Sequence, residues 1–282
     1  MFSLIQMLGR AAPKIDVIDV GAMWLGPEHV TYRALVTAGL ARVVGFEPVK
    51  AECDRLNAMA MKDQRYLPYF IGDGTRRRFF EGTEYPMNSS LYRPNMALLS
   101  KFQNLAELME HREGVDVETK RLDDLTEIED VDFLKADVQG AELDVFRGAE
   151  RRLSQALVLE TEAEFLPLYE GQPLFADVDS FLRARGFVFH TFAGLTGRCF
   201  KPVVARNDVN AMIRQLLWSN AVYVKDFLRF DALPAQKLLK LAVILHEVYG
   251  SADLASLALE AHDAQTKAGL HPIYMQRLTG GK

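Results

Sequence analysis

The chain has 282 residues, of which 49% are hydrophobic, and its 33 basic and 38 acidic residues give a formal net charge of −5. A chain of this length and composition can fill one sizeable core, which excludes general disorder. The mild negative balance argues against a partner that is held through its phosphate backbone. We therefore expect no nucleic acid among the partners.

Cysteine usage and the N-terminal segment bear on the compartment. Cys53 and Cys199 lie far apart in the sequence, and neither belongs to a Cys/His cluster of the kind that binds zinc. We expect two reduced thiols, no metal site and a cytoplasmic location. The apolar segment 2–8 lacks preceding basic residues and fits a secretory signal badly. No stretch approaches the roughly 20 apolar residues of a membrane span.

Short apolar runs that alternate with helical patterns predict the fold class. The strand-like runs are residues 14–21, 41–47, 65–71, 131–137, 156–162, 187–192 and 221–225. Near-continuous apolar runs are typical of a parallel sheet covered on both faces, and parallel neighbours need helical crossovers. The sequence therefore predicts an α/β fold, with a doubly wound, mostly parallel, Rossmann-like sheet.

The same patterns divide the chain into three regions. Residues 1–14 read as a leader or helix, residues 15–230 as the main domain, and residues 231–282 as a C-terminal helical hairpin of about two helices. The hairpin either packs on the main domain or mediates a homodimer. Residues 72–95 are rich in glycine and proline and predict a functional loop or lid.

Acidic residues follow the first two strands, where ligands bind in open α/β sheets. Asp19 and Gly21 close the first strand, and Glu47 closes the second. An acid at the second position suits hydrogen bonds from ribose hydroxyls. The first turn lacks the Gly-x-Gly-x-x-Gly cradle that binds a pyrophosphate, so a dinucleotide is disfavoured. A nucleoside without phosphate fits better, and S-adenosylmethionine is the commonest such cofactor.

The third and fourth strand ends also carry an acid each. Asp73 is placed to meet an adenine amino group, although an Asp-Gly turn explains it equally well. Asp137 is aimed at the reacting centre.

Taken together, these segments resemble the FkbM-type methyltransferases over roughly residues 15–230. The motifs that carry the resemblance are Ile18–Ala22, Gly45–Pro48, Ile71–Asp73, Leu122–Leu125 and Asp132–Leu143. The resemblance implies an S-adenosylmethionine-dependent O-methyltransferase that acts on a hydroxyl, which we expect to belong to a saccharide or glycan component.

The resemblance also implies site roles. They are Asp19, Gly21 and Ala22 at the methionine end of the cofactor, Glu47 and Pro48 at the ribose, Asp73 on the adenine side and Asp137 beside the sulfonium. One departure is that Met23 stands where the family commonly has asparagine, and that Trp24 and Leu25 separate it from Gly26.

Transfer of a methyl group to an alcohol needs alignment of the nucleophile and removal of its proton. Asp137 is the first candidate for the base or for an orienting group, and His190 is the second, although a structural histidine also explains His190. The residues predicted to contact the acceptor are Asn88, Ser89, Ser90, Glu162 and Tyr169.

Two alternatives stay open. One is a methyltransferase-like domain that has lost turnover and serves as a binding or assembly module, for which the altered first loop is the best support. The other is an NAD-dependent oxidoreductase, which is the weaker because the glycine fingerprint and a clear catalytic pair are missing.

Overall fold

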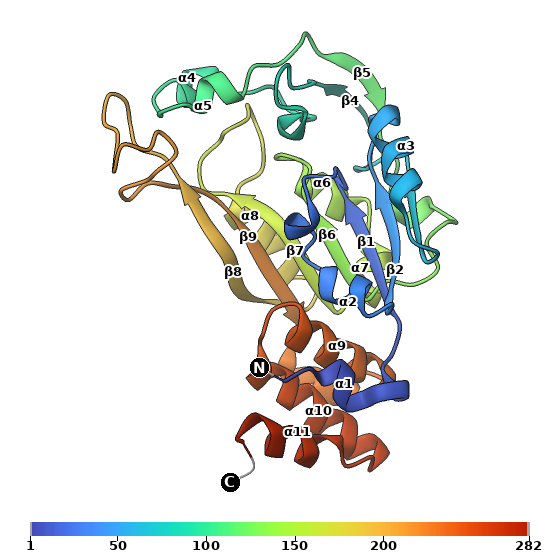
Figure 1. Ribbon diagram of the computed structural model, residues 1–282. Coiled ribbons are helices and arrows are strands. Elements are labelled where there is room, and N and C mark those ends of the chain that lie inside the picture. Colours follow the sequence, from blue (N-terminus) through green and yellow to red (C-terminus); the bar gives the residue numbers. More distant parts are fainter. Residues whose placement is uncertain (1, 281–282) are drawn as a thin grey trace.

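A computed structural model describes residues 2–280, and one large sheet organises it (Figure 1). The strand order is β3-β2-β1-β6-β7-β9-β8, in which the first five strands run parallel and β9 runs antiparallel to both of its neighbours. The strands are β1 (Ile15–Val20), β2 (Ala41–Phe46), β3 (Gln64–Leu67), β6 (Phe133–Ala136), β7 (Val158–Glu164), β8 (Phe187–Gly197) and β9 (Leu216–Lys225). The predicted α/β class and mostly parallel sheet are confirmed.

Helices cover both faces of this sheet. Those before residue 200 are α1 (Leu4–Leu8), α2 (Arg33–Thr37), α3 (Lys50–Met59), α4 (Met96–Leu99), α5 (Leu105–Leu108), α6 (Glu142–Arg147), α7 (Glu150–Gln155) and α8 (Phe175–Arg183). Apolar residues of α1 and α2 share one buried cluster with Val17, Val43 and Val158, whereas those of α6, α7 and α8 share another with Ile18 and Leu134. Side chains alternate along a strand, so the two clusters lie on opposite faces.

The C-terminal region contains one helix more than the sequence analysis expected. The helices are α9 (Ala235–Glu247), α10 (Ala252–Thr266) and α11 (Leu270–Leu278), preceded by the 3-10 helix η5 (Phe227–Ala232). Alpha9 and α10 form the predicted hairpin and join the first of the two clusters, and Tyr274 of α11 is fully buried in it. This region therefore packs on the main domain.

Buried ion pairs fix α9 to the amino ends of two strands. Lys240 lies 2.6 Å from Asp132 and 3.1 Å from Asp16, and Lys237 lies 2.7 Å from Asp132. Because Asp132 is fully buried, these lysines compensate a charge that would otherwise be costly. The pairs lie at the end of the sheet away from the predicted ligand site.

Residues 72–120 form a cap above the carboxyl ends of the strands, at the top of Figure 1. The cap contains α4, α5 and a two-stranded antiparallel sheet of β4 (Arg76–Phe79) and β5 (Val115–Glu118), which the sequence analysis did not predict. The arginines of β4 pair with acids of the protein itself: Arg76 with Glu118, Arg78 with Glu113, and Arg77 with Asp73 and Asp144. This arginine run is therefore an internal network.

Candidate active site

A cavity of about 780 Å³ lies between the carboxyl ends of the parallel strands and the cap. Its lining comes from the ends of β1, β2, β6 and β7, among them the adjacent pair β1 and β6 from which the sheet is wound in two directions. That switch point is where open α/β sheets bind ligands. The predicted site residues that line it are Asp19, Gly21, Ala22, Glu47, Pro48, Asn88, Ser89, Ser90, Asp137, Glu162 and Tyr169.

Asp19 near the end of β1 is a buried carboxylate with one oxygen left open. Its Oδ2 accepts a hydrogen bond of 2.7 Å from the Tyr32 hydroxyl, whereas its Oδ1 has no hydrogen-bond partner among the described residues. The Asp19 side chain is buried, and an unsatisfied buried acceptor is costly. The open oxygen is suited to a donor that enters the cavity.

Gly21 brings the first loop close to the end of β6. Its φ is 81°, and a Cβ there would lie 1.9 Å from the main-chain oxygen of Asp137. A side chain is therefore excluded on two grounds, conformation and space. The glycine allows the first and fourth strand ends to meet, which places Asp19 and Asp137 at one cavity.

Glu47 follows β2 and is 3% exposed. Its Oε1 accepts a hydrogen bond of 2.8 Å from the main-chain N–H of Val49. Burial raises the pKa of Glu47 to about 7, since the charged form loses hydration and one hydrogen bond compensates only in part. The group is poised between its two forms near neutral pH.

Lys135 is one of two site residues that the sequence analysis missed. It lies on β6, two residues before Asp137, and its Nζ is 3.6 Å from Asp19 Oδ1 and 3.5 Å from Asp137 Oδ2. These two carboxylates and Glu160 raise the pKa of Lys135 despite its burial. A lysine inside an otherwise apolar strand was the signal that could have identified it.

Gln139 is a second missed residue, in the loop between β6 and α6. Its φ is 56°, a left-handed conformation that is uncommon outside glycine. Its side-chain Nε2 donates to Asp137 at 3.0 Å and to Glu162 at 2.7 Å, while its Oε1 accepts from the Tyr169 hydroxyl at 3.0 Å. The strained loop thus fixes the orientation of two cavity acids.

Three glutamates add further acidic groups beside Asp137. Burial and the neighbouring negative charges raise the pKa values of Glu142 and Glu162 well above the ordinary range, and burial raises the pKa of Glu164 to about 7. Carboxylate oxygens of Asp137, Glu142 and Glu162 lie within 4.8 Å of one another. The negative charges so close together contribute to the raised pKa values of Glu142 and Glu162, because like charges repel at short range.

The cap residues predicted to contact an acceptor are partly engaged with the protein. Asn88 Nδ2 donates to Leu108, and Ser89 Oγ donates to the main-chain oxygen of Pro86. Ser90 Oγ donates to the main-chain oxygen of Gln139 at 2.6 Å, and this hydrogen bond joins the cap to the loop between β6 and α6. Tyr169 is fully buried and its hydroxyl donates to Gln139 Oε1, so its ring does not offer an exposed face for stacking on a sugar.

Two predicted residues lie elsewhere. Asp73 is not among the residues that line the cavity, and its carboxylate accepts from Thr75 and pairs with Arg77. His190 is also outside the lining, and its Nε2 lies 2.6 Å from Ser251 Oγ at the start of α10. Burial lowers the pKa of His190. The position of His190 therefore fits a structural role, in contact with Ser251, better than the role of a catalytic base.

The altered first loop is part of the cavity. Met23, Trp24 and Leu25 all line it, and the main-chain N–H of Trp24 donates to Glu52 of α3. The longer loop therefore forms part of the cavity wall and is joined to α3.

Comparisons with known proteins agree with this arrangement. A family model described as the methyltransferase FkbM domain matches residues 18–189. The 2-O-methyltransferase NoeI of Sinorhizobium fredii is 35% identical over 153 residues, which are 49% of this chain and 60% of that protein. The chain therefore spans about 60% of the length of the curated relative that it matches.

Two solved structures are also similar. A putative methyltransferase from Thermoplasma acidophilum has 11% identity and a TM-score of 0.38, over 76% of this chain and 69% of the other. A precorrin-6y C5,15-methyltransferase from Geobacter metallireducens has 15% identity and a TM-score of 0.37, over 77% of this chain and 82% of the other. Within residues 2–280, no helix is both long and apolar enough to span a bilayer.

Proposed function

Since this chain belongs to the FkbM methyltransferase family, we propose that it transfers a methyl group from S-adenosylmethionine to a saccharide hydroxyl. The observation that carries the proposal is the convergence of Asp19, Glu47 and Asp137, from three adjacent strand ends, on one cavity. The 2-O-methyltransferase activity in the name of the relative supports a hydroxyl as the acceptor.

The residues present fit this cofactor. Asp19 Oδ1 is a buried acceptor that has no hydrogen-bond partner among the described residues, with Lys135 at the longer distance of 3.6 Å, and such an oxygen suits the ammonium group of a methionine end. Among the described residues the Glu47 carboxylate accepts one hydrogen bond, from Val49, so when it is ionised it can also accept from ribose hydroxyls. A phosphate-free nucleoside needs no glycine cradle, in agreement with the first loop.

When bound, S-adenosylmethionine supplies a methyl group on a positively charged sulfonium. In our proposal Asp137 lies beside that charge, and Lys135 on β6 holds both Asp19 and Asp137 in place. Lys135 also limits the repulsion between these carboxylates before the cofactor enters.

We assign removal of the acceptor proton to Glu162 rather than to His190. Glu162 lines the cavity and its Oε2 accepts a hydrogen bond of 2.7 Å from Gln139, so its ionised form presents a fixed oxygen as a proton acceptor. His190 lies outside the lining. Glu162 therefore takes the proton as the new O–C bond forms, while Asp137 orients the reacting centre.

Polar groups of the cap and of β9 support a saccharide as the acceptor. Asn88, Ser89 and Ser90 line the cavity, and so do Ser219 and Asn220 of β9. Hydroxyl and amide groups of this kind both donate to and accept from sugar hydroxyls. The cytoplasmic location and a homodimer stay predictions.

The test is methyl transfer from methyl-labelled S-adenosylmethionine to a panel of oligosaccharides. We expect label in an O-methyl sugar, and Glu162→Gln should abolish its appearance while cofactor binding persists. Cofactor binding without transfer to any hydroxyl compound would instead favour the binding-module alternative.

A further inference from the structure

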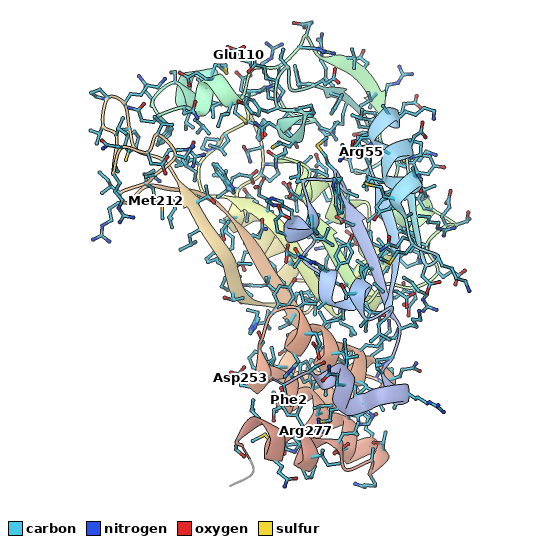
Figure 2. All side chains as sticks on the ribbon, viewed as in Figure 1. Phe2, Arg55, Glu110, Met212, Asp253 and Arg277 are labelled. Carbon is cyan, nitrogen blue, oxygen red and sulfur yellow. The ribbon has the colours of Figure 1, made fainter. Side chains whose placement is uncertain are left out.

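The connection between β8 and β9, residues 198–215, projects from the sheet beside the cavity, and we call it the rim hairpin (Figure 1). Arg198 at its start lines the cavity, as do Thr196 on β8 and Trp218 on β9. In Figure 2 the labelled Met212 lies on this hairpin, on the opposite side of the molecule from the labelled Arg55 of α3. Whatever binds the rim hairpin therefore sits next to the entrance of the site.

The rim hairpin is built as a protrusion. Arg206 and Asn207 form a tight turn with φ values of 55° and 56°, closed by a bridge between Ala205 and Asp208. At its base the ring of Phe200 stacks on Phe102 of the cap at 4.6 Å. These contacts give the segment a defined shape outside the core.

The rim hairpin exposes large apolar side chains. At least two fifths of each of the following is exposed: Phe200, Val203, Val204, Val209 and Ile213, the last at 63%. Leu195 at the adjoining end of β8 is 49% exposed. Clustered apolar side chains at one projecting site indicate an interaction surface, whereas single exposed ones need no explanation.

The charge of the rim hairpin is opposite to that of the chain. It carries four basic side chains, Arg198, Lys201, Arg206 and Arg214, against the single acid Asp208, whereas the whole chain has a net charge of −5. Arg206 and Arg214 are exposed, and among the described residues neither makes an ion pair. Over its length the rim hairpin therefore combines two exposed arginines, which form no ion pair among the described residues, with exposed apolar groups.

We propose that the rim hairpin docks on an anionic lipid bilayer and holds the cavity entrance at the membrane surface. Exposed apolar side chains enter the boundary between headgroups and acyl chains, and arginines pair with anionic headgroups. Neither signal alone gives stable attachment, and the rim hairpin supplies both. Resting on the proposed function, this geometry makes the acceptor a saccharide carried by a lipid.

Flotation with vesicles tests this proposal on the full chain. We expect binding to phosphatidylcholine vesicles that contain phosphatidylglycerol, weaker binding at high salt and little binding to pure phosphatidylcholine. Ile213→Asp with Val204→Asp, and separately Arg206→Glu with Arg214→Glu, should each weaken binding about tenfold or more. The matched control is Leu228→Asp, because Leu228 is 81% exposed but lies on η5, near the C-terminal helices.

Calorimetric affinity for S-adenosylmethionine, measured on the same variants, should be unchanged and shows that each is folded. Vesicle binding without cofactor binding would uphold the docking surface and refute the proposed function. Absence of vesicle binding, or equal loss in the Leu228 control, would overturn the docking surface. So would a dimer, seen by light scattering, that the rim variants dissociate while vesicle binding is absent.

Discussion

Lys135 Nζ lies 3.6 Å from Asp19 Oδ1, the carboxylate oxygen without a hydrogen-bond partner among the described residues. The same ammonium lies 3.5 Å from Asp137, so one lysine is shared by acids from two strand ends. The buried ammonium of Lys135 therefore lies between Asp19 and Asp137 before any ligand binds, and it comes from the same strand end as Asp137.

Replacement of this lysine should destabilise the fold. Lys135→Met leaves Asp19 and Asp137 without a counter-charge, so we expect the free energy of unfolding to fall by about 3–5 kcal/mol in urea denaturation. Adding Asp137→Asn to this variant should recover part of the loss. Lys50→Met is the matched control, since Lys50 pairs with Asp54 on an exposed helix face and should change stability little. A Lys135 variant as stable as this control would contradict the charge-sharing account.

The affinity for S-adenosylmethionine should depend on pH through Glu47. The pKa of Glu47 is about 7, and the ionised form is the one that accepts from both ribose hydroxyls. We expect calorimetric affinity to increase as the pH rises from 6 to 8. Glu47→Gln should bind more weakly at pH 8 and show a flatter pH dependence. A wild-type protein whose affinity falls over this range would refute the assignment.

Glu47 should also make the stability of the fold depend on pH. Rising pH should lower the free energy of unfolding, although it increases the affinity for the cofactor. The folded state of Glu47 binds its proton more tightly than the unfolded state, so its contribution to stability is lost as pH rises from about 4.5 to about 7. Above pH 7, Glu47→Gln should raise the free energy of unfolding by about 1–3 kcal/mol, whereas at pH 4.5 the two proteins should differ little. Denaturant titrations at the two pH values provide the measurement. A variant less stable than wild type at pH 8 would show that Glu47 is compensated by contacts other than those described.

Substitutions of Glu162 and Asp137, the two acids held by Gln139, should differ in their effects on cofactor binding and on turnover. Glu162→Gln should lower kcat about a hundredfold or more while cofactor affinity changes less than about threefold, because the base acts on the acceptor. Asp137→Asn should weaken the cofactor as well, since its charge lies beside the sulfonium. Equal effects of both variants on cofactor affinity would contradict the division of roles.

The C-terminal helices should unfold together with the sheet. Tyr249, just after α9, donates to Glu160 of β7 at 2.8 Å, and Thr31 donates to the other oxygen of the same carboxylate at 2.7 Å. Tyr249→Phe removes one of these donors from a buried acid, so we expect a loss of about 1–3 kcal/mol in a single transition. Two separate transitions in calorimetry would show that residues 231–282 form an independent unit.

The sheet could be predicted because each of its strands is a short apolar run beside a turn or helix, as in residues 14–21 and 131–137. The acids at the strand ends were predictable for the same reason, since position along a strand decides which end it reaches. Lys135 and Gln139 were not, because their roles depend on which other strand end faces them.

Other elements carry weak local signals. Helix α11 begins after Gly269, contains Pro272 near its start and has Tyr274 as its one fully buried residue, so its apolar pattern is short. Strand β4 reads Arg76–Arg77–Arg78 before Phe79, and its pairing with β5 depends on acids distant in the sequence. Asp73 was placed at a ligand on the strength of its strand end, but local donors and Arg77 engage its carboxylate.

Calorimetric titration with S-adenosylmethionine tests the central claim most directly, with wild type and Glu47→Ala compared at pH 8. We expect saturable binding with one site per chain, weakened about tenfold or more by the substitution. Absence of binding at millimolar cofactor, in protein shown to be folded, would contradict the methyltransferase assignment and leave a binding or assembly module as the function of this cavity.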